Sequence, residues 1–280
     1  MKTKMPEELT RDVPQTKWGK ILLATPVVMT VIATLLAGLA SSEMTRAQYD
    51  RALGAQLQSK AGDQWGYFQA KKLRGAMQRN SFELLNATVD IRPIENAALE
   101  KVPAPAALSL DSKVEAALQA IDKQQPETEI AVLLKSVDDK SLATALQAAK
   151  DNALAFDTTL APAIEALDQL EKSLPAGDKA AARDLTAARM RYNAARYDTE
   201  ARLNQSIANL YELQVRKINL SAERHHKRSG KFFFGMLAAQ AAVIVSTFAI
   251  AAQKRNFLWS LAAVAGLAAI IFAIYVYLRV

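Results

Sequence analysis

Three long apolar runs without a charged residue constrain the fold of this chain more than any other feature. They cover residues 21–40, 232–252 and 257–278. A helix of about 20 apolar residues can cross the roughly 30 Å hydrocarbon core of a bilayer. The alternating patterns of β-strands are nearly absent, which predicts an all-α fold. We therefore predict an all-α integral membrane protein with three transmembrane helices, preceded by an N-terminal tail at residues 1–20.

The region between the first and second runs, residues 41–231, is predicted to form a long helical stalk. Residues 42–89 contain no proline, and residues 178–226 contain neither proline nor glycine. The first of these segments carries apolar residues at helical spacing, namely Leu53, Leu57, Ala61, Trp65 and Phe68. We expect the two segments to pair as antiparallel, coiled-coil-prone helices that continue into the membrane, with Gly230 as a candidate hinge.

Residues 89–177 are predicted to form a helical tip at the far end of the stalk. Pro93, Pro103 and Pro105 indicate a linker, and Ser112 to Glu115 reads as a capping box that starts a helix. A further helical pattern covers residues 142–174, in which Pro162 is expected to restart the helix.

The positive charge is concentrated next to the apolar runs. The net charge is +7, but residues 41–231 hold 27 basic and 25 acidic residues, and no basic groove with interleaved aromatics is found. This argues against nucleic-acid binding and favours membrane lipids as partners. The predicted contacts of lipid headgroups are Arg224, Lys227, Arg228 and Lys231.

The charge distribution favours a cytoplasmic N-terminus and an extracytoplasmic stalk. Short loops on the cytoplasmic side are enriched in Lys and Arg, and the N-terminal tail and the turn at 253–256 carry more of them than the C-terminal end. The basic residues between 216 and 231 favour the opposite orientation. An alternative for the first run is a cleaved signal peptide, because residues 37–41 weakly resemble a processing site.

No constellation of catalytic, cofactor-binding or metal-binding residues stands out. The chain has no cysteine, and its only histidines, His225 and His226, are adjacent rather than four residues apart as in a helical metal site. Trp65 and Phe68 are predicted to pack within the stalk. Gln69 or Asp63 would form hydrogen bonds across the stalk helices, and Gln240 is expected to do so between membrane helices.

Two segments resemble an uncharacterised family of bacterial membrane proteins. Residues 63–71, with the sequence DQWGYFQAK, and residues 222–228, with the sequence AERHHKR, resemble the family called domain of unknown function 4337. Gly66 and Phe68 depart mildly from its pattern. The resemblance covers about 18–85 and 200–278 and implies three spans and paired long helices in a bacterial inner membrane. It implies no activity.

The sequence thus favours a non-enzymatic scaffold or accessory subunit without a cofactor. We expect it to assemble as a homo-oligomer or within a larger membrane complex, because the apolar stripes of the stalk helices are too irregular for two strands alone. The alternatives are an extracytoplasmic sensor that acts through a signalling partner, and an oligomeric channel.

Overall fold

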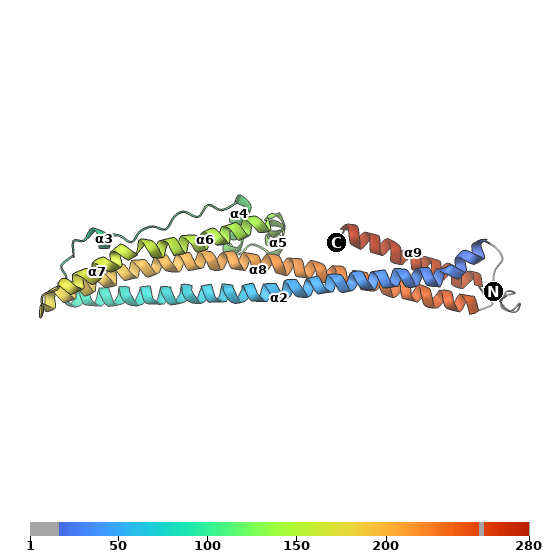
Figure 1. Cartoon of the computed structure of the whole chain (residues 1–280), viewed down its shortest axis with the longest axis horizontal. Coiled ribbons are helices and arrows are strands. Elements are labelled where there is room, and N and C mark those ends of the chain that lie inside the picture. Colours follow the sequence, from blue (N-terminus) through green and yellow to red (C-terminus); the bar gives the residue numbers. More distant parts are fainter. Residues whose placement is uncertain (1–16, 252–254, 280) are drawn as a thin grey trace, which may run out of the picture. The chain divides into compact units, whose positions relative to one another are not determined.

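The computed structural model describes residues 17–251 and 255–279 and confirms the all-α fold. No strand occurs in these two ranges. The expectations for the N-terminal tail and the 253–256 turn fall largely on residues 1–16 and 252–254, outside the described residues. The chain divides into two compact units, unit 1 with residues 1–51 and 219–280 and unit 2 with residues 52–218. The helices are α2 (Lys17–Thr88), α3 (Ala97–Glu100), α4 (Ser112–Asp122), α5 (Glu127–Ser136), α6 (Asp139–Thr159), α7 (Ala161–Ser173), α8 (Lys179–Ala251) and α9 (Arg255–Arg279) (Figure 1).

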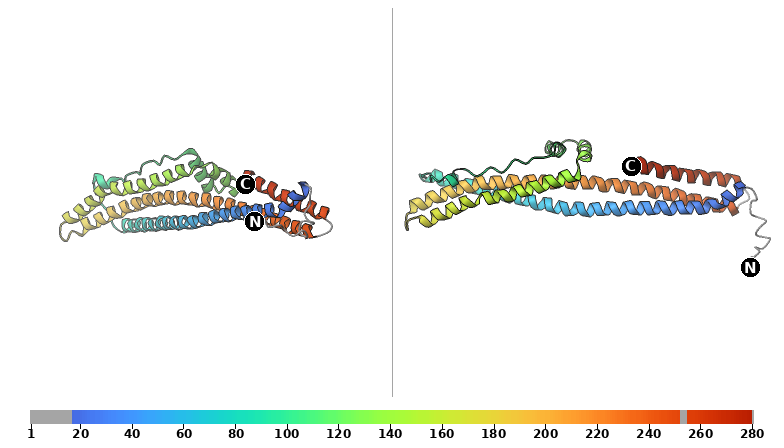
Figure 2. Two further views of the ribbon diagram at one scale, coloured as in Figure 1. Left: turned by 45° about the vertical axis from the view of Figure 1, so that its right-hand side comes forward. Right: turned by 45° about the horizontal axis from the view of Figure 1, so that its top comes forward.

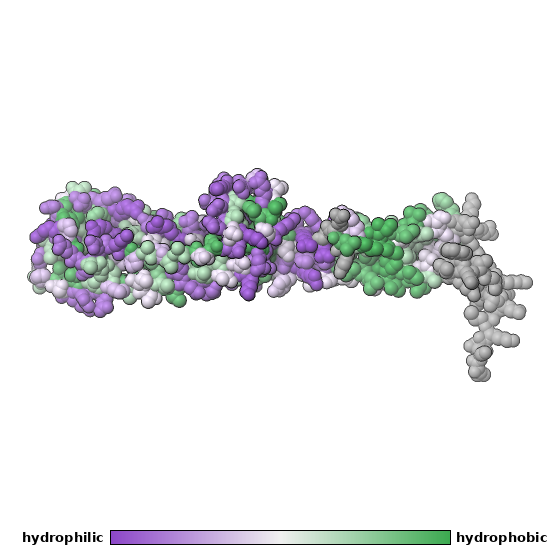
Figure 3. Space-filling model, turned by 90° about the horizontal axis from the view of Figure 1, so that it is seen from above, coloured by the Kyte–Doolittle hydropathy of each residue, from purple (hydrophilic) through white to green (hydrophobic). Residues whose placement is uncertain are grey.

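Unit 1 contains the three apolar segments. Each of three helices, α2, α8 and α9, includes a stretch long and apolar enough to cross a membrane. Hydrophobic residues dominate the surface of these segments in Figure 3. The sequence predicts that the stalk begins at residue 41. In the structure, residues 41–51 and 219–231 belong to unit 1 together with the apolar segments, and unit 2 begins at residue 52.

Small residues allow the three helices of unit 1 to pack closely. Leu36, Phe232 and Val276, from three different helices, share one apolar cluster. A Cβ atom placed on Gly266 of α9 would lie only 2.7 Å from the Met29 sulfur of α2. The flexible end of the Met29 side chain would therefore have to move if residue 266 carried a side chain.

Unit 2 is built around α8. α8 lies between α2 on one side and α6 and α7 on the other (Figures 1 and 2). Contacts such as Trp65 with Glu212, and Lys71 with Glu200, show that α2 and α8 run antiparallel. The buried positions of α2 alternate at spacings of three and four residues, which is the 3.5-residue period of coiled-coil seams. In unit 2 the series consists of the buried Gly54, Ala61 and Gly75 and the half-buried Leu57, Gln64, Phe68, Lys71, Gln78, Phe82 and Leu85, with the half-buried Leu53 and Trp65 beside it.

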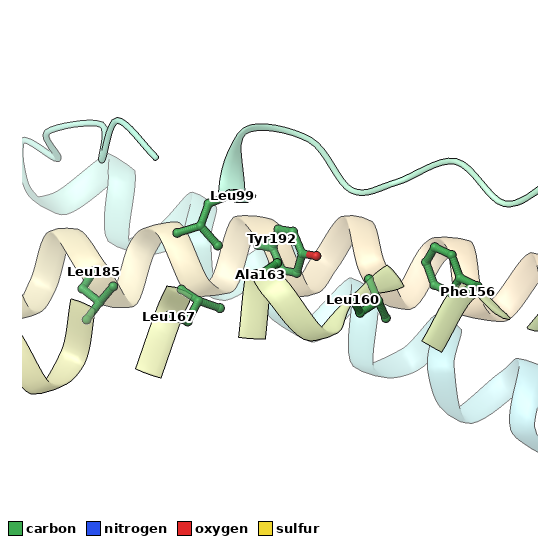
Figure 4. Close-up of a cluster of buried hydrophobic side chains, with 7 residues drawn as sticks. All are labelled: Leu99, Phe156, Leu160, Ala163, Leu167, Leu185 and Tyr192. Carbon is green, nitrogen blue, oxygen red and sulfur yellow. The ribbon is translucent and has the colours of Figure 1, made fainter. Parts of the chain in front are cut away.

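Residues 89–177 lie alongside α8 rather than forming the tip that the sequence predicts. Arg216 of α8 lies 2.5 Å from Glu127 of α5, and Lys217 forms an ion pair with Asp139. A buried cluster joins Leu99 and the α6–α7 region to α8 (Figure 4), and its members are Leu99, Phe156, Leu160, Ala163, Leu167, Leu185 and Tyr192. The physical reason is that α6 and α7 carry an apolar stripe, which gains by covering α8 instead of remaining in water.

The connections differ from the sequence prediction in two details. Asp111, not Ser112, caps α4, since its side chain accepts a hydrogen bond from the Lys113 backbone N–H. α8 continues through Gly230 without a hinge. The extended segment before α4 is held by Asn152, whose side chain donates to the Ala106 carbonyl at 2.7 Å and accepts from the Ala106 N–H at 3.2 Å.

The packing of α6 generates a prediction with a matched control. Leu142 is 2% exposed and Leu154 is 70% exposed on the same helix. Leu142→Ala should lower the free energy of unfolding by about 2–5 kcal/mol, because it leaves a cavity in the core. Leu154→Ala should change it by less than about 0.5 kcal/mol. Thermal unfolding of the full chain in mild detergent measures both, and equal shifts would contradict the burial of Leu142.

Candidate functional site

A buried carboxylate lies where the polar and apolar parts of unit 1 meet. Glu43 of α2 is only 7% exposed. Its carboxylate lies 2.5 Å from His225 Nδ1 and 3.4 Å from an Arg228 guanidinium nitrogen. One turn away, the Ser229 hydroxyl donates to the Ala40 carbonyl at 2.7 Å. We call these four side chains, Glu43, His225, Arg228 and Ser229, the Glu43 cluster.

The Glu43 cluster fixes the register of α2 against α8. A buried charge is tolerated only when it is paired, so sliding one helix by a turn would leave the Glu43 carboxylate unpaired. Sequence analysis missed this residue. A signal was available, because Glu43 follows Leu36 and Ala40 and precedes Ala47 at the same alternating spacing of three and four. A charged residue in such an apolar series indicates a buried partner on the facing helix.

Further charged contacts connect α2 and α8 within unit 2. Glu200 is 5% exposed and accepts from Lys71 and, at 2.6 Å, from Arg196. Asp198 forms ion pairs with Arg79 and, at 3.5 Å, with Lys72. Because Glu200 and Asp198 of α8 both meet basic residues of α2, these pairs select the antiparallel register rather than add much to stability.

The predicted packing residues of the stalk separate into two groups. Trp65 and Phe68 face α8: their rings meet edge to face at 5.4 Å between centroids, and the Trp65 N–H donates to Glu212 at 2.7 Å. Gln69 and Asp63 are exposed, and within the described part of the chain no hydrogen bond joins either side chain to α8. Gln64, and not Gln69, lies on the side of α2 that packs against α8.

Gln240 also faces outward. It is exposed on α8 in the apolar segment of unit 1, and no hydrogen bond from it is found among the described residues. The sequence interpretation expected Gln240 to form a hydrogen bond across membrane helices, and this stays a prediction.

The four basic residues predicted to contact lipid headgroups have different surroundings. Arg228 points inward to the Glu43 cluster, and Lys231 lies 5.5 Å from the centroid of the Tyr275 ring. Lys227 donates to Glu223 at 2.6 Å, and this hydrogen bond, together with the Lys227 charge, lowers the pKa of the Glu223 carboxyl. Arg224 is exposed on the helix surface. Lipid binding by these residues stays a prediction.

Unit 2 contains a cavity of about 870 Å³ between residues 93–102 and α8. Its lining includes Asn96, Leu99 and Tyr192. The Tyr192 hydroxyl is buried without a hydrogen-bond partner among the described residues. Burial raises the pKa of this hydroxyl, an effect that the Arg196 charge partly offsets. The described residues contain no group of three side chains placed to hold a metal ion.

The Glu43 cluster predicts unequal roles for two glutamates of unit 1. Glu43→Ala should lower the free energy of unfolding by about 3–5 kcal/mol, because it leaves His225 and Arg228 without their buried partner. Glu223→Ala removes an exposed pair and should leave the melting temperature unchanged. Thermal unfolding of the full chain at neutral pH compares them, and an unchanged melting temperature for Glu43→Ala would refute the register role.

Tyr192 gives a pH-dependent prediction. Since its pKa is raised in the folded chain, its contribution to stability is complete below the ordinary tyrosine pKa of about 10 and is lost as the pH rises further. Tyr192→Phe should therefore reduce the alkaline loss of stability. At neutral pH it should be neutral or stabilise by up to about 1 kcal/mol, because the hydroxyl has no partner. Tyr49→Phe, at a 69% exposed position, is the control and should do neither.

Comparison with known proteins identifies the family. The family model described as Domain of unknown function (DUF4337) matches residues 21–168, which is more than half of the chain. The match extends through residues 90–168, where no motif was recognised in the sequence, and it ends before α8, so the C-terminal resemblance is not part of it. No curated protein and no solved structure matches the chain. The chain belongs to the DUF4337 family, a domain of unknown function.

Proposed function

We propose that the protein is a membrane-anchored, non-enzymatic scaffold or accessory subunit that binds a partner helix through unit 2. The observation that carries this proposal is an uncovered and uncharged face of α2. α8 covers α2 on one side only (Figure 1). The opposite side remains in contact with solvent in the single chain.

The uncovered face of α2 runs along most of unit 2. It consists of residues that are all exposed and uncharged and that recur every three or four positions: Ala55, Ser59, Gly62, Gly66, Ala70, Leu73, Met77, Ser81, Leu84 and Thr88. Leu73, Met77 and Leu84 are 63%, 59% and 68% exposed. A helix face in contact with water normally carries charged residues, so an uncharged face of this length favours contact with another protein.

Two glycines on this face support the same conclusion. Gly62 and Gly66 have open space around them, so nothing in the chain itself requires the absence of a side chain. Glycine within a helix costs roughly 0.5–1 kcal/mol relative to alanine. Gly75 differs, because a Cβ atom there would already lie 3.4 Å from Tyr197 of α8. Close approach by a helix of another molecule would explain Gly62 and Gly66.

The rim of the uncovered face fits a protein interface as well. The nearest charged residues, Asp63 and Arg74, are exposed beside the face rather than on it. At the far end, Leu84 and Thr88 border a groove of about 550 Å³ that Met190 of α8 also lines. An apolar centre with polar residues at the rim is the usual anatomy of such interfaces.

The test compares charge insertion on two surfaces of unit 2. The double substitution Leu73→Glu and Met77→Glu should dissociate the bound subunit or second copy, because it buries two carboxylates in the interface. Leu154→Glu places one carboxylate at a 70% exposed position of α6 and should leave the assembly intact. Native mass spectrometry of each protein, released from native membranes in mild detergent, gives the stoichiometry.

The proposal fails if the unsubstituted protein is monomeric under these conditions with no bound protein subunit. It also fails if the α2 double variant and the α6 variant retain the same assembly.

A further inference from the structure

A polar side chain lies in the middle of an apolar segment and faces away from its own chain. Gln240 is exposed and follows Lys231, the last charged residue before the apolar part of α8, by nine positions. At 1.5 Å per residue this separation is about 13 Å along the helix. Its side chain is therefore too deep in the predicted span to reach water at that end.

A carboxamide in this position requires a hydrogen-bond partner from outside the chain. Transfer of an amide into hydrocarbon is unfavourable unless its donors and acceptor are satisfied. Neither α2 nor α9 supplies a partner to Gln240 among the described residues. The need for a hydrogen-bond partner rests on the proposed function, in which this part of α8 anchors the protein in a membrane.

The neighbours of Gln240 form an exposed seam on α8. Phe233, Leu237, Gln240, Ile244 and Thr247 are all exposed and alternate at spacings of four and three residues. We call these five residues the α8 seam. The opposite side of the same segment is buried against the rest of unit 1 and includes Phe232, Ala239, Ala242 and Ser246. The α8 seam has the period at which two helices pack side by side over a long distance.

We propose that the α8 seam binds the α8 seam of a second copy, with the two Gln240 side chains hydrogen-bonded to each other. Two copies in one membrane have the same direction, so a two-fold axis along the membrane normal makes their α8 helices parallel and brings each seam residue opposite itself. Gln offers both a donor and an acceptor in one group. The two carboxamides therefore exchange two hydrogen bonds, as a single polar residue does at the centre of a parallel coiled coil.

A groove beside the seam leaves room for the second copy. Phe233 lines a cavity of about 520 Å³ together with Ala37, Ala40 and Met44 of α2 and Met236 of α8. The lining is almost entirely apolar, so apolar side chains of the second copy suit it.

Disulfide cross-linking in liposomes tests the orientation, since the chain has no cysteine of its own. Ile244→Cys lies in the seam and should form a covalent dimer on oxidation, because facing seam positions are near enough for a disulfide. Ala241→Cys is also exposed but lies outside the seam. It should cross-link far less at the same protein-to-lipid ratio.

Substitution of Gln240 tests the hydrogen bond itself. Gln240→Leu should weaken the dimer roughly tenfold in liposomes, and Gln240→Asn should largely retain it. Gln240 is exposed and forms no hydrogen bond with the described residues, so the melting temperature of the monomer in detergent serves as the folding control. Equal cross-linking by the cysteines at 241 and 244, a monomeric protein at every lipid ratio, or full dimerisation of Gln240→Leu would overturn the inference.

The outcome is separable from that of the proposed function. The α8 dimer can fail to form while the protein still binds a subunit that the substitutions Leu73→Glu and Met77→Glu release. This result would overturn only the pairing through Gln240.

Discussion

The packing of α2 against α8 is the interaction on which the other features of this protein depend. In both units the two helices meet along a narrow seam that is rich in alanine and glycine and is interrupted by charged pairs. Small residues bring the backbones close, while Glu43 and Glu200 meet their basic partners in one register only. With α8 fixed in this way, its other side offers the apolar surface that α6 and α7 cover.

The sequence was sufficient to predict the helices but not how they pack. Uncharged runs of 20 or more residues and the lack of proline in residues 42–89 led to α2, α8 and α9, and Pro162 marks the break between α6 and α7. The course of residues 89–177 was not predictable in the same way. An apolar stripe such as Leu160 and Leu167 shows that a helix is covered on one side, but it does not show which helix covers it. Only the assembled unit reveals that the partner is α8.

The same distinction applies to the candidate site. Trp65 and Phe68 share a helix face by spacing alone, so their packing toward α8 follows from the sequence. The orientations of Gln69 and Gln240 could be predicted only by knowing which side of each helix is buried, because polar residues occur on either side of a helix. Glu43 was missed because an isolated acidic residue is ordinarily solvated. Its significance depends on His225, which is 182 positions away in the chain.

This long separation has a consequence for biosynthesis. Ser229 and Ala40, which join α8 to α2, are 189 positions apart. At 5–20 residues per second, a ribosome needs roughly 10–40 s to synthesise the intervening polypeptide. During that interval α2 exists without α8, so its alanine-rich seam has nothing to pack against and the Glu43 carboxylate has no basic partner. The side of α2 that later packs against α8 therefore stays uncovered for that interval.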